Sequence, residues 1–429
     1  MVGYAMRLSL PQHIPLNHAK TTFYWTAQGR SSIESSYGPR LGGLGPVPQP
    51  NIEFVRIAGT IFAADRSTPR QGGGSNWNQR EIQVVIPVGN VSRWEAVAGD
   101  LGQLFGFLTG DRWTLSFARA TSRVEPIAAH QPGTRRVVLL SGGADSAIGA
   151  LLSRSQLTAK ERHTLVSHVG LKNLAPIQRH VAEQAERLIP GPGQQHLQIG
   201  FRRHSQQPNG VKFQNEPSSR SRSLLFLAFG LAVAALDGVP LWIPENGFAS
   251  LNPPLGPERR GSLSTRTTHP FFLSELRRVL STVGAHADIL NPLADMTKGE
   301  MFTMAAGLVG AAEAAAFLSS THSCGLTGQR AFGISPAKQC GVCFGCVVRR
   351  ASFVATGLPD STDYISPSSV DRVAAWLAAN SVERSVQDFV RRGVRPRDVT
   401  TLNLPPGYAA ADALDLCQRQ AEELARLFP

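Results

Sequence analysis

The chain has few lysines, few cysteines and no long hydrophobic run. Only six of its 43 basic residues are lysine, and only five of its 429 residues are cysteine. No apolar stretch reaches the roughly 18 residues that a membrane-spanning helix needs. Residues 1–7 also lack the apolar region of a signal peptide. These absences predict a protein that does not enter the membrane, and we expect it to reside in the cytoplasm.

The net charge of +12 rests mainly on arginine. A basic protein can bind nucleic acid, but the chain has no run of five basic residues and no basic stretch interleaved with aromatic side chains. The arginines gather instead in small groups such as Arg202-Arg203, Arg259-Arg260 and Arg349-Arg350. We interpret this charge as a solvated surface combined with a funnel for an anionic substrate, and nucleic acid is not favoured as a partner.

Four of the five cysteines fall within 23 residues, at Cys324, Cys340, Cys343 and Cys346. In a cytosolic protein such crowding rarely indicates disulfides. Gaps of two residues let neighbouring thiolates converge on one tetrahedral ion, and zinc is the usual occupant of a closed four-cysteine site. The spacing alone leaves an iron–sulfur cluster open, because such clusters also use four thiolates. We predict a structural zinc site that clips a loop, and we expect Cys417 to lie in a helix core.

A buried strand, a glycine turn and a helix are predicted in succession over residues 136–152. β-Branched residues and leucine lead into Gly142 and Gly143, and an apolar helical pattern follows. Glycine lets the backbone approach an anion closely, and the first N–H groups of the helix point at that anion. An ordinary strand–helix turn is the simpler alternative, but the pattern favours a phosphate-binding nest. No lysine follows the glycines, so the loop is not a Walker A motif.

The hexapeptide Ser-Gly-Gly-Ala-Asp-Ser at residues 141–146 resembles the SGGxDS signature of the PP-loop ATP pyrophosphatases. That family splits ATP between its α and β phosphates and adenylates an oxygen atom of its substrate. Together with the four cysteines, the motif is similar to the QueC family, the 7-cyano-7-deazaguanine synthases. The other matching positions are Pro292-Leu293, Lys298, Glu300, Ser323, Gly341, Arg349 and Phe353. The resemblance covers about residues 134–357.

Several features depart from the compact QueC enzymes. Residues 219–223 read Ser-Arg-Ser-Arg-Ser where the family has Pro-Ala-Arg-Asn, and 15 residues separate Cys324 from Cys340. Residues 1–133 and 358–429 have no counterpart in those enzymes. In these respects the chain looks like the longer QueC-like proteins of bacterial anti-phage operons, above all the QatC group of the QatABCD systems. Related proteins of that group are thought to join a deazaguanine to a partner protein.

The resemblance implies an ATP-dependent ligase that activates a 7-deazaguanine carboxylic acid, releases AMP and pyrophosphate, and transfers the acyl group to an amine. It implies ATP, Mg²⁺ and Zn²⁺ as cofactors. The amine is either ammonia or a group on a partner protein, and the sequence does not separate the two. Two alternatives stay open: a PP-loop enzyme that modifies tRNA bases, and a subunit that senses ATP without turning it over.

Roles for individual residues combine this resemblance with their positions at predicted helix starts and strand ends. The nest formed by Ser141, Gly142, Gly143, Ala144, Asp145 and Ser146 is expected to hold the departing pyrophosphate, and His168 and Val169 are expected beside adenine. Arg222 and Lys298 each begin a predicted helix and would bring a cation to the phosphates. Glu245 and Asn246 are candidates for gripping the substrate ring, although Asn-Gly is also a turn signal. The catalytic candidates are thus Asp145, Lys298 and Arg222, with helix capping as the alternative role of Asp145.

Three regions are predicted along the chain. Residues 1–133 are expected to form an N-terminal α+β accessory domain, with strands at 52–64, 81–88 and 113–120 and a helix at 91–108. Residues 134–357 alternate strand and helix, which predicts a doubly wound parallel sheet. By resemblance this α/β domain is a PP-loop fold, HUP-like and related to the adenine nucleotide alpha hydrolases. A C-terminal helical cap is expected over 358–429, and the polar segments 205–223 and 250–270 are predicted lids.

Overall fold

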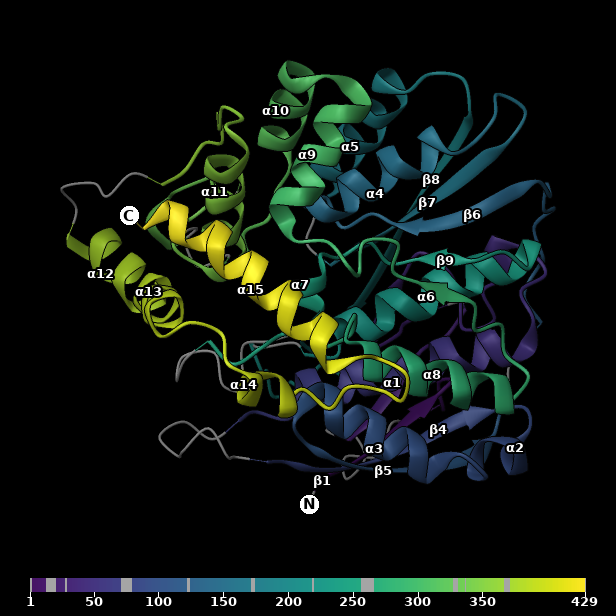
Figure 1. Cartoon of the computed structure of the whole chain (residues 1–429). Helices are drawn as coiled ribbons and strands as arrows, with labels where there is room; N and C mark the ends of the chain where they lie inside the picture. The colour runs from purple at the N-terminus through teal and green to yellow at the C-terminus, as the bar shows by residue number, and fades with distance from the viewer. Residues whose placement is uncertain are drawn as a thin grey trace.

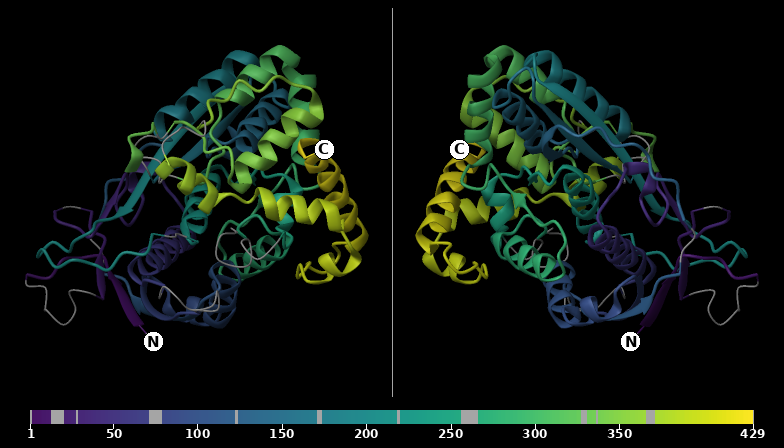
Figure 2. Two further views of the ribbon diagram at one scale, coloured as in Figure 1. Left: turned by 90° about the vertical axis from the view of Figure 1, so that its left-hand side faces the viewer. Right: turned by 90° about the vertical axis from the view of Figure 1, so that its right-hand side faces the viewer.

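The computed structural model describes residues 2–12, 21–27, 29–70, 79–121, 124–170, 174–217, 220–255, 266–326, 331–335, 337–365 and 371–428. Strands and helices of the N-terminal part pack beneath a central parallel sheet, and helices from the end of the chain cover one flank (Figures 1 and 2). Among the described residues, none of the helices is both long enough and apolar enough to cross a membrane.

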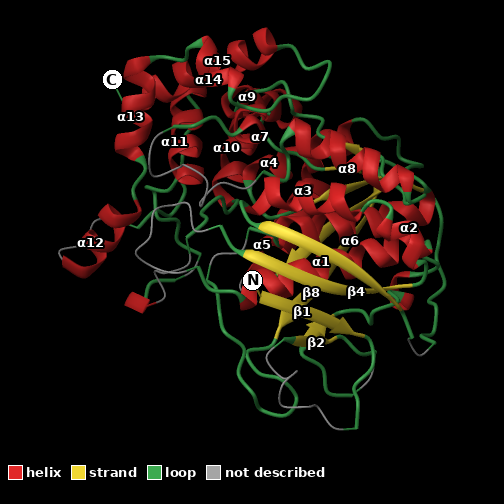
Figure 3. Ribbon diagram, turned by 90° about the horizontal axis from the view of Figure 1, so that it is seen from below, coloured by secondary structure: helices red, strands yellow, loops and turns green. Residues whose placement is uncertain are grey.

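The N-terminal part contains a four-stranded parallel sheet in the order β2-β1-β4-β5, seen from below in Figure 3. The strands and helices of the N-terminal part are β1 (Val2–Arg7), β2 (Thr22–Tyr24), β3 (Ile33–Ser35), α1 (Gln49–Ser67), β4 (Glu81–Val88), α2 (Val91–Glu95), α3 (Ala98–Thr109) and β5 (Arg112–Arg119). The strands expected at 81–88 and 113–120 are therefore present, and the helix expected at 91–108 is divided into α2 and α3.

The strand predicted at residues 52–64 is wrong, because these residues lie within helix α1. Nearly every side chain of α1 is buried, so no polar face reveals the helical period in the sequence. The run of isoleucine, valine and phenylalanine then looks like a strand. Pro50 lies in the first turn, which is the position in a helix that tolerates proline.

The central sheet has the strand order β10-β9-β6-β7-β8-β3. Its strands and helices up to residue 320 are β6 (Thr134–Leu139), α4 (Ala144–Ser155), β7 (Arg162–Val169), α5 (Leu174–Leu188), β8 (Gly193–Arg203), α6 (Arg222–Asp237), β9 (Leu241–Trp242), α7 (Gly247–Leu251), α8 (Pro270–Thr282), β10 (Ile289–Leu290), α9 (Lys298–Val309) and α10 (Ala311–Ser320). All pairs are parallel except that of β3 with β8. The predicted parallel sheet is confirmed.

Helices cover both faces of this sheet because alternate residues of each strand point to opposite sides. On β6, Val137 and Leu139 belong to the hydrophobic core that contains α1 and α6. Their neighbours Val138 and Leu140 belong to a second core with α4, α5, α9 and α10. After β6, the chain adds β7 and β8 on one side and later β9 and β10 on the other. The order therefore reverses between β6 and β9, the place where open α/β sheets bind ligands.

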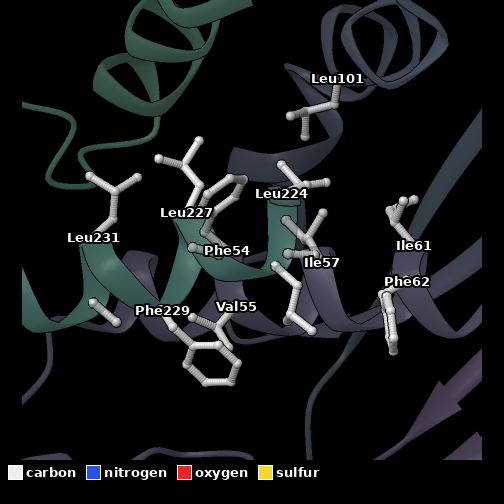
Figure 4. Close-up of a cluster of buried hydrophobic side chains, with 14 of the residues drawn as sticks. Phe54, Val55, Ile57, Ile61, Phe62, Leu101, Leu224, Leu227, Phe229 and Leu231 are labelled. Atoms are coloured by element: carbon white, nitrogen blue, oxygen red, sulfur yellow. The ribbon is translucent and has the colours of Figure 1, made fainter. Parts of the chain in front are cut away.

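The N-terminal part and the central sheet share one hydrophobic core. Helix α1 lies along α6, with Phe54 and Ile57 of α1 close to Leu224 and Leu227 of α6 (Figure 4). Strand β3, from the N-terminal part, forms an edge of the central sheet. The boundary expected at residue 133 stays a prediction, and the packing across it is continuous.

The end of the chain is helical, as α11 (Phe344–Thr356), α12 (Asp371–Asn380), α13 (Glu383–Arg392), α14 (Pro396–Thr400) and α15 (Ala410–Leu427). Helix α15 crosses from α7 to α11 and also contacts α9. Leu416 and the buried Cys417 of α15 lie in a core with Phe248 and Val347. Cys417 therefore packs in a helix core, as expected.

A close contact between α4 and the end of β9 provides a test of this fold. A Cβ atom on Gly149 would lie 2.1 Å from Pro244 Cγ, whereas one on Gly307 of α9 would meet no atom within 4 Å. We expect Gly149→Ala to destabilise the protein by about 1–3 kcal/mol through overpacking. Gly307→Ala, the matched control, should be neutral or stabilise by up to about 1 kcal/mol. Urea unfolding of both variants checks this, and equal midpoints would contradict the packing.

Candidate functional site

The glycine loop after β6 is closed by its own serines. Gly142 has a φ of +92°, a conformation that side-chain-bearing residues rarely adopt, and Gly143 is the N-cap of α4. The hydroxyl of Ser146 accepts a hydrogen bond from the backbone N–H of Ser141 at 3.1 Å and lies 3.0 Å from the Ser141 hydroxyl. The loop thus presents the start of α4, where the first N–H groups have no acceptor within the helix. Such an end attracts an anion.

Asp145 lies in the first turn of α4 but does not cap the helix, so the capping alternative is wrong. Its carboxylate forms a buried ion pair with the Lys298 ammonium and accepts a hydrogen bond from the Asn246 side chain at 2.8 Å. Burial alone would raise the pKa of Asp145, but the charge of Lys298 and these hydrogen bonds hold it below its ordinary value. Asp145 is therefore an anion at neutral pH.

Lys298 and Asn246 reach Asp145 because of how their own elements begin. Lys298 is the first residue of α9, which starts with a capping box between Thr297 and Glu300. Asn246 caps α7 by accepting a hydrogen bond from the N–H of Ala249 at 2.8 Å, so its Asn-Gly pair begins a helix and not a simple turn. Both ends of the Asn246 amide have partners, and its contact with a substrate stays a prediction.

A cavity of about 280 Å³ opens beside the loop, at the reversal of strand order. Its lining comes from five places in the chain and includes the loop serines Ser141 and Ser146, His168 at the end of β7, Arg222 at the start of α6, and Glu245 after β9. Five predicted residues, from four separate segments of the chain, therefore surround one space. Arginine and the helix N-terminus make this space attractive to an anion.

His168 faces the cavity as a neutral side chain. Burial, with a smaller contribution from the nearby charge of Arg222, lowers the pKa of His168 to about 4. Val169 is the last residue of β7, and adjacent strand residues point to opposite faces. Any contact of Val169 with a ligand in this cavity would therefore use its backbone.

Asn291 is a residue of this site that sequence reasoning did not single out. Its side-chain amide donates to the Glu245 carbonyl at 2.8 Å and its oxygen accepts from the Glu245 N–H at 3.2 Å. The pair fixes the backbone of Glu245 beside the cavity. The signal was its position directly after β10, at the same edge of the sheet as the loop.

The described end of the second predicted lid is anchored. Residues 256–265, which include Arg259 and Arg260, lie outside the described residues. The Arg266 guanidinium lies over the ring of Phe107 in α3, and His269 caps α8. Thr267 and Thr268, between them, line the cavity.

The four cysteines Cys324, Cys340, Cys343 and Cys346 form a compact buried cluster with all sulfur atoms within 4.8 Å of one another. The Sγ atoms of Cys340 and Cys346 are 3.8 Å apart, and those of Cys324 and Cys343 are 4.0 Å apart. Four sulfurs bound at about 2.3 Å to one tetrahedral ion would be about 3.8 Å apart. A multi-iron cluster distributes its thiolates over several metals and needs wider spacing. The geometry therefore fits a single zinc ion.

The cysteine cluster is connected to the glycine loop through residues 321–323. The backbone N–H of His322 donates to the Gly142 carbonyl at 2.8 Å. The Arg349 side chain holds the same segment by donating to the Thr321 hydroxyl at 2.7 Å, and Gln339 bonds the backbone of Thr321 and Ser323 at 3.0 Å. Arg349 matches a family position. For Gln339, the only signal in the sequence was its position directly before Cys340.

We expect the Lys298–Asp145 pair to be essential for stability. Lys298→Met leaves a buried carboxylate without its counter-charge, which should destabilise the protein by about 3–5 kcal/mol. Asp145→Asn in the same chain should recover part of that loss. Lys338→Met is the control, because its ion pair with Asp363 is exposed and should contribute at most about 1 kcal/mol. Unfolding by urea measures the wild type and these three variants, and equal losses at Lys298 and Lys338 would contradict the assignment.

We also expect one zinc ion per chain and little iron. Cys343→Ser should abolish metal binding and weaken ATP binding, because the clipped segment contacts the glycine loop. Cys417→Ala, which removes a cysteine of the helix core, should keep the metal. Metal analysis of the purified proteins by mass spectrometry checks the stoichiometry. Iron in place of zinc, or full metal content in Cys343→Ser, would show that the cluster is misassigned.

The chain is similar in sequence to curated 7-cyano-7-deazaguanine synthases from three Cupriavidus species. Those of C. necator and C. taiwanensis are each 27% identical over 245 residues, which is 54% of this chain and 97% of the relative. That of C. metallidurans is 26% identical over 249 residues, which is 54% of this chain and 99% of the relative. No protein-family profile and no solved structure matches the chain.

Nearly the whole length of each relative is therefore contained in about half of this chain. The chain that shows this sequence similarity also contains the glycine loop, the parallel sheet and the four-cysteine cluster. The chain is thus similar to the QueC family, the 7-cyano-7-deazaguanine synthases, over about half of its length.

Proposed function

We propose that the protein is an ATP-dependent, AMP-forming ligase that acts on the carboxylate of a 7-deazaguanine-type acid. The observation that carries this proposal is the cavity at the strand reversal, where Ser141, Ser146, Arg222 and Glu245 meet beside the start of α4. The similarity to 7-cyano-7-deazaguanine synthases supports the substrate class. We also propose that the protein resides in the cytoplasm.

The reaction begins when a carboxylate oxygen of the substrate attacks the α-phosphorus of ATP. The bond to the β-phosphate breaks, and pyrophosphate leaves. The N–H groups at the start of α4 and the Arg222 guanidinium would stabilise the charge that develops on the leaving group. Mg²⁺ would enter with ATP and screen its phosphates. An amine then attacks the acyl-adenylate, loses a proton and releases AMP.

Neutral His168 suits a place beside the adenine ring, because it adds contact area without a charge. Glu245 lines the same cavity and would bind N–H groups of the deazaguanine. The zinc ion has a structural role in this scheme, since its four cysteine ligands leave no open coordination position. It would hold residues 321–323 against the loop.

The amine is ammonia or a group on a partner protein, and the proposed setting is a bacterial anti-phage system of the QatC type. This setting is supported by the resemblance to the longer QueC-like proteins and by the additional N- and C-terminal residues.

The proposal is tested by incubating the protein with Mg-ATP, with and without 7-carboxy-7-deazaguanine, and by separating AMP from ADP. We expect AMP that depends on the acid. Ser146→Ala should lower the rate roughly 10²-fold, because it removes the hydroxyl that holds the loop's N–H donors in place. Ser155→Ala, an exposed serine at the other end of the same helix, should leave it unchanged.

Two results would contradict the proposal. ATP binding without AMP release under any of these conditions would favour the ATP-sensing alternative. AMP that appears only when tRNA is added would favour the base-modifying alternative.

A further inference from the structure

Both cations assigned to the site begin a helix, and both helix starts are held by side chains from outside the central sheet and its helices. Arg222 begins α6 and lines the cavity, and Lys298 begins α9 and pairs with Asp145. The residue that begins a helix is positioned by whatever satisfies the free N–H groups there. The partners of these two helix starts therefore decide where the cations lie.

The start of α6 is held by Asp65 of helix α1. Ser221, the N-cap residue, makes no side-chain cap of its own. Its N–H and its hydroxyl instead both donate to Asp65 Oδ2, at 3.2 and 2.7 Å. Both residues are fully buried. A carboxylate from the N-terminal part thus fixes the N-cap residue of α6, directly before Arg222.

Asp65 is itself fixed by a buried network of charges. Arg80 donates to Asp65 at 2.5 Å and to Asp111 at 2.6 Å. Asp111 also accepts a two-pronged pair of hydrogen bonds from Arg70, at 2.9 and 2.7 Å. Helix α1, which carries Asp65, also packs along α6 through hydrophobic side chains (Figure 4). The carboxylate that binds Ser221 therefore has little freedom to move.

The start of α9 is held in the same way by helix α15. The N–H of Lys298 donates to Gln420 Oε1 at 3.2 Å, and the N–H of Gly299 donates to Glu423 Oε2 at 3.0 Å. The Thr297 hydroxyl also donates to Glu423. A Cβ atom on Gly299 would lie 2.5 Å from the Glu423 carboxylate, so only glycine permits this approach. The capping box of Thr297 and Glu300 is thus completed by acceptors from the C-terminal region.

We propose that the two flanking regions act as clamps that position the site cations, with Asp65 acting through Ser221 on Arg222 and Glu423 acting through the start of α9 on Lys298. The inference rests on the proposed function only in taking ATP as the ligand. Asp65 and Glu423 are positioning residues, and neither lines the cavity. If a clamp is lost, the affinity for ATP should fall only because the corresponding cation, Arg222 or Lys298, is no longer held in place.

Double-mutant cycles on the full-length protein test this, with the dissociation constant of Mg-ATP measured by calorimetry. Asp65→Asn risks unfolding, because it would leave Arg80 short of a counter-charge. Ser221→Ala is the milder change, since it removes one hydrogen bond to Asp65. We expect it to weaken ATP binding about fivefold, and to have no further effect in a chain that already carries Arg222→Ala. Ser352→Ala, another buried serine, should have no effect on ATP binding.

The parallel cycle pairs Glu423→Gln with Lys298→Met, and we expect the same loss of additivity. If the two substitutions of each cycle raise the dissociation constant by independent factors that multiply, the inference is overturned. A purely structural role would weaken ATP binding whether or not the cation is present. Absence of ATP binding in the wild type would overturn it together with the proposed function. ATP binding without AMP release counts against the proposed function alone, and the cycles still decide whether the clamps exist.

Discussion

The buried ion pair between Asp145 and Lys298 is the interaction on which the site depends. It joins the first turn of α4 to the first residue of α9, and Asn246 adds the start of α7 to the same point. Segments far apart in the sequence are thereby held around one carboxylate. Two buried charges are costly to desolvate, so their close pairing and further hydrogen bonds are what make this arrangement tolerable.

The glycine loop next to this pair is supported from two directions. Its own serines close it on the inside, and the segment of residues 321–323 contacts it from the outside. That segment leads directly into Cys324, so a metal ion in the four-cysteine cluster would stiffen it. A loop that must present backbone N–H groups to an anion gains from this support, because preorganised donors need no rearrangement when charge develops.

The additional residues at both ends of the chain contribute to the same architecture. Helix α1 shares a hydrophobic core with α6, and α15 packs against α7, α9 and α11. The buried charges of Asp65, Arg80 and Asp111 lie where the N-terminal part meets the start of α6.

Local patterns in the sequence were sufficient for the parallel sheet, the loop at 141–146 and the four-cysteine cluster. Each depends on short spacing: alternation along a strand, two glycines before a helix, and thiolates two residues apart. Family positions also indicated Arg222 and Lys298 before their contacts were known, and its place at the end of a predicted strand indicated Glu245. The helical state of residues 52–64 was not predictable in this way, because a helix buried on all sides shows no polar face.

Only the tertiary structure decided which partners these residues have. Asp145 could have capped its helix, but the folded chain brings Lys298 and Asn246 to it from distant elements. The caps from Asp65 and Glu423 likewise join residues that are far apart in the sequence. A sequence pattern reports the period and spacing of nearby residues, whereas a hydrogen bond between distant segments depends on how whole helices pack.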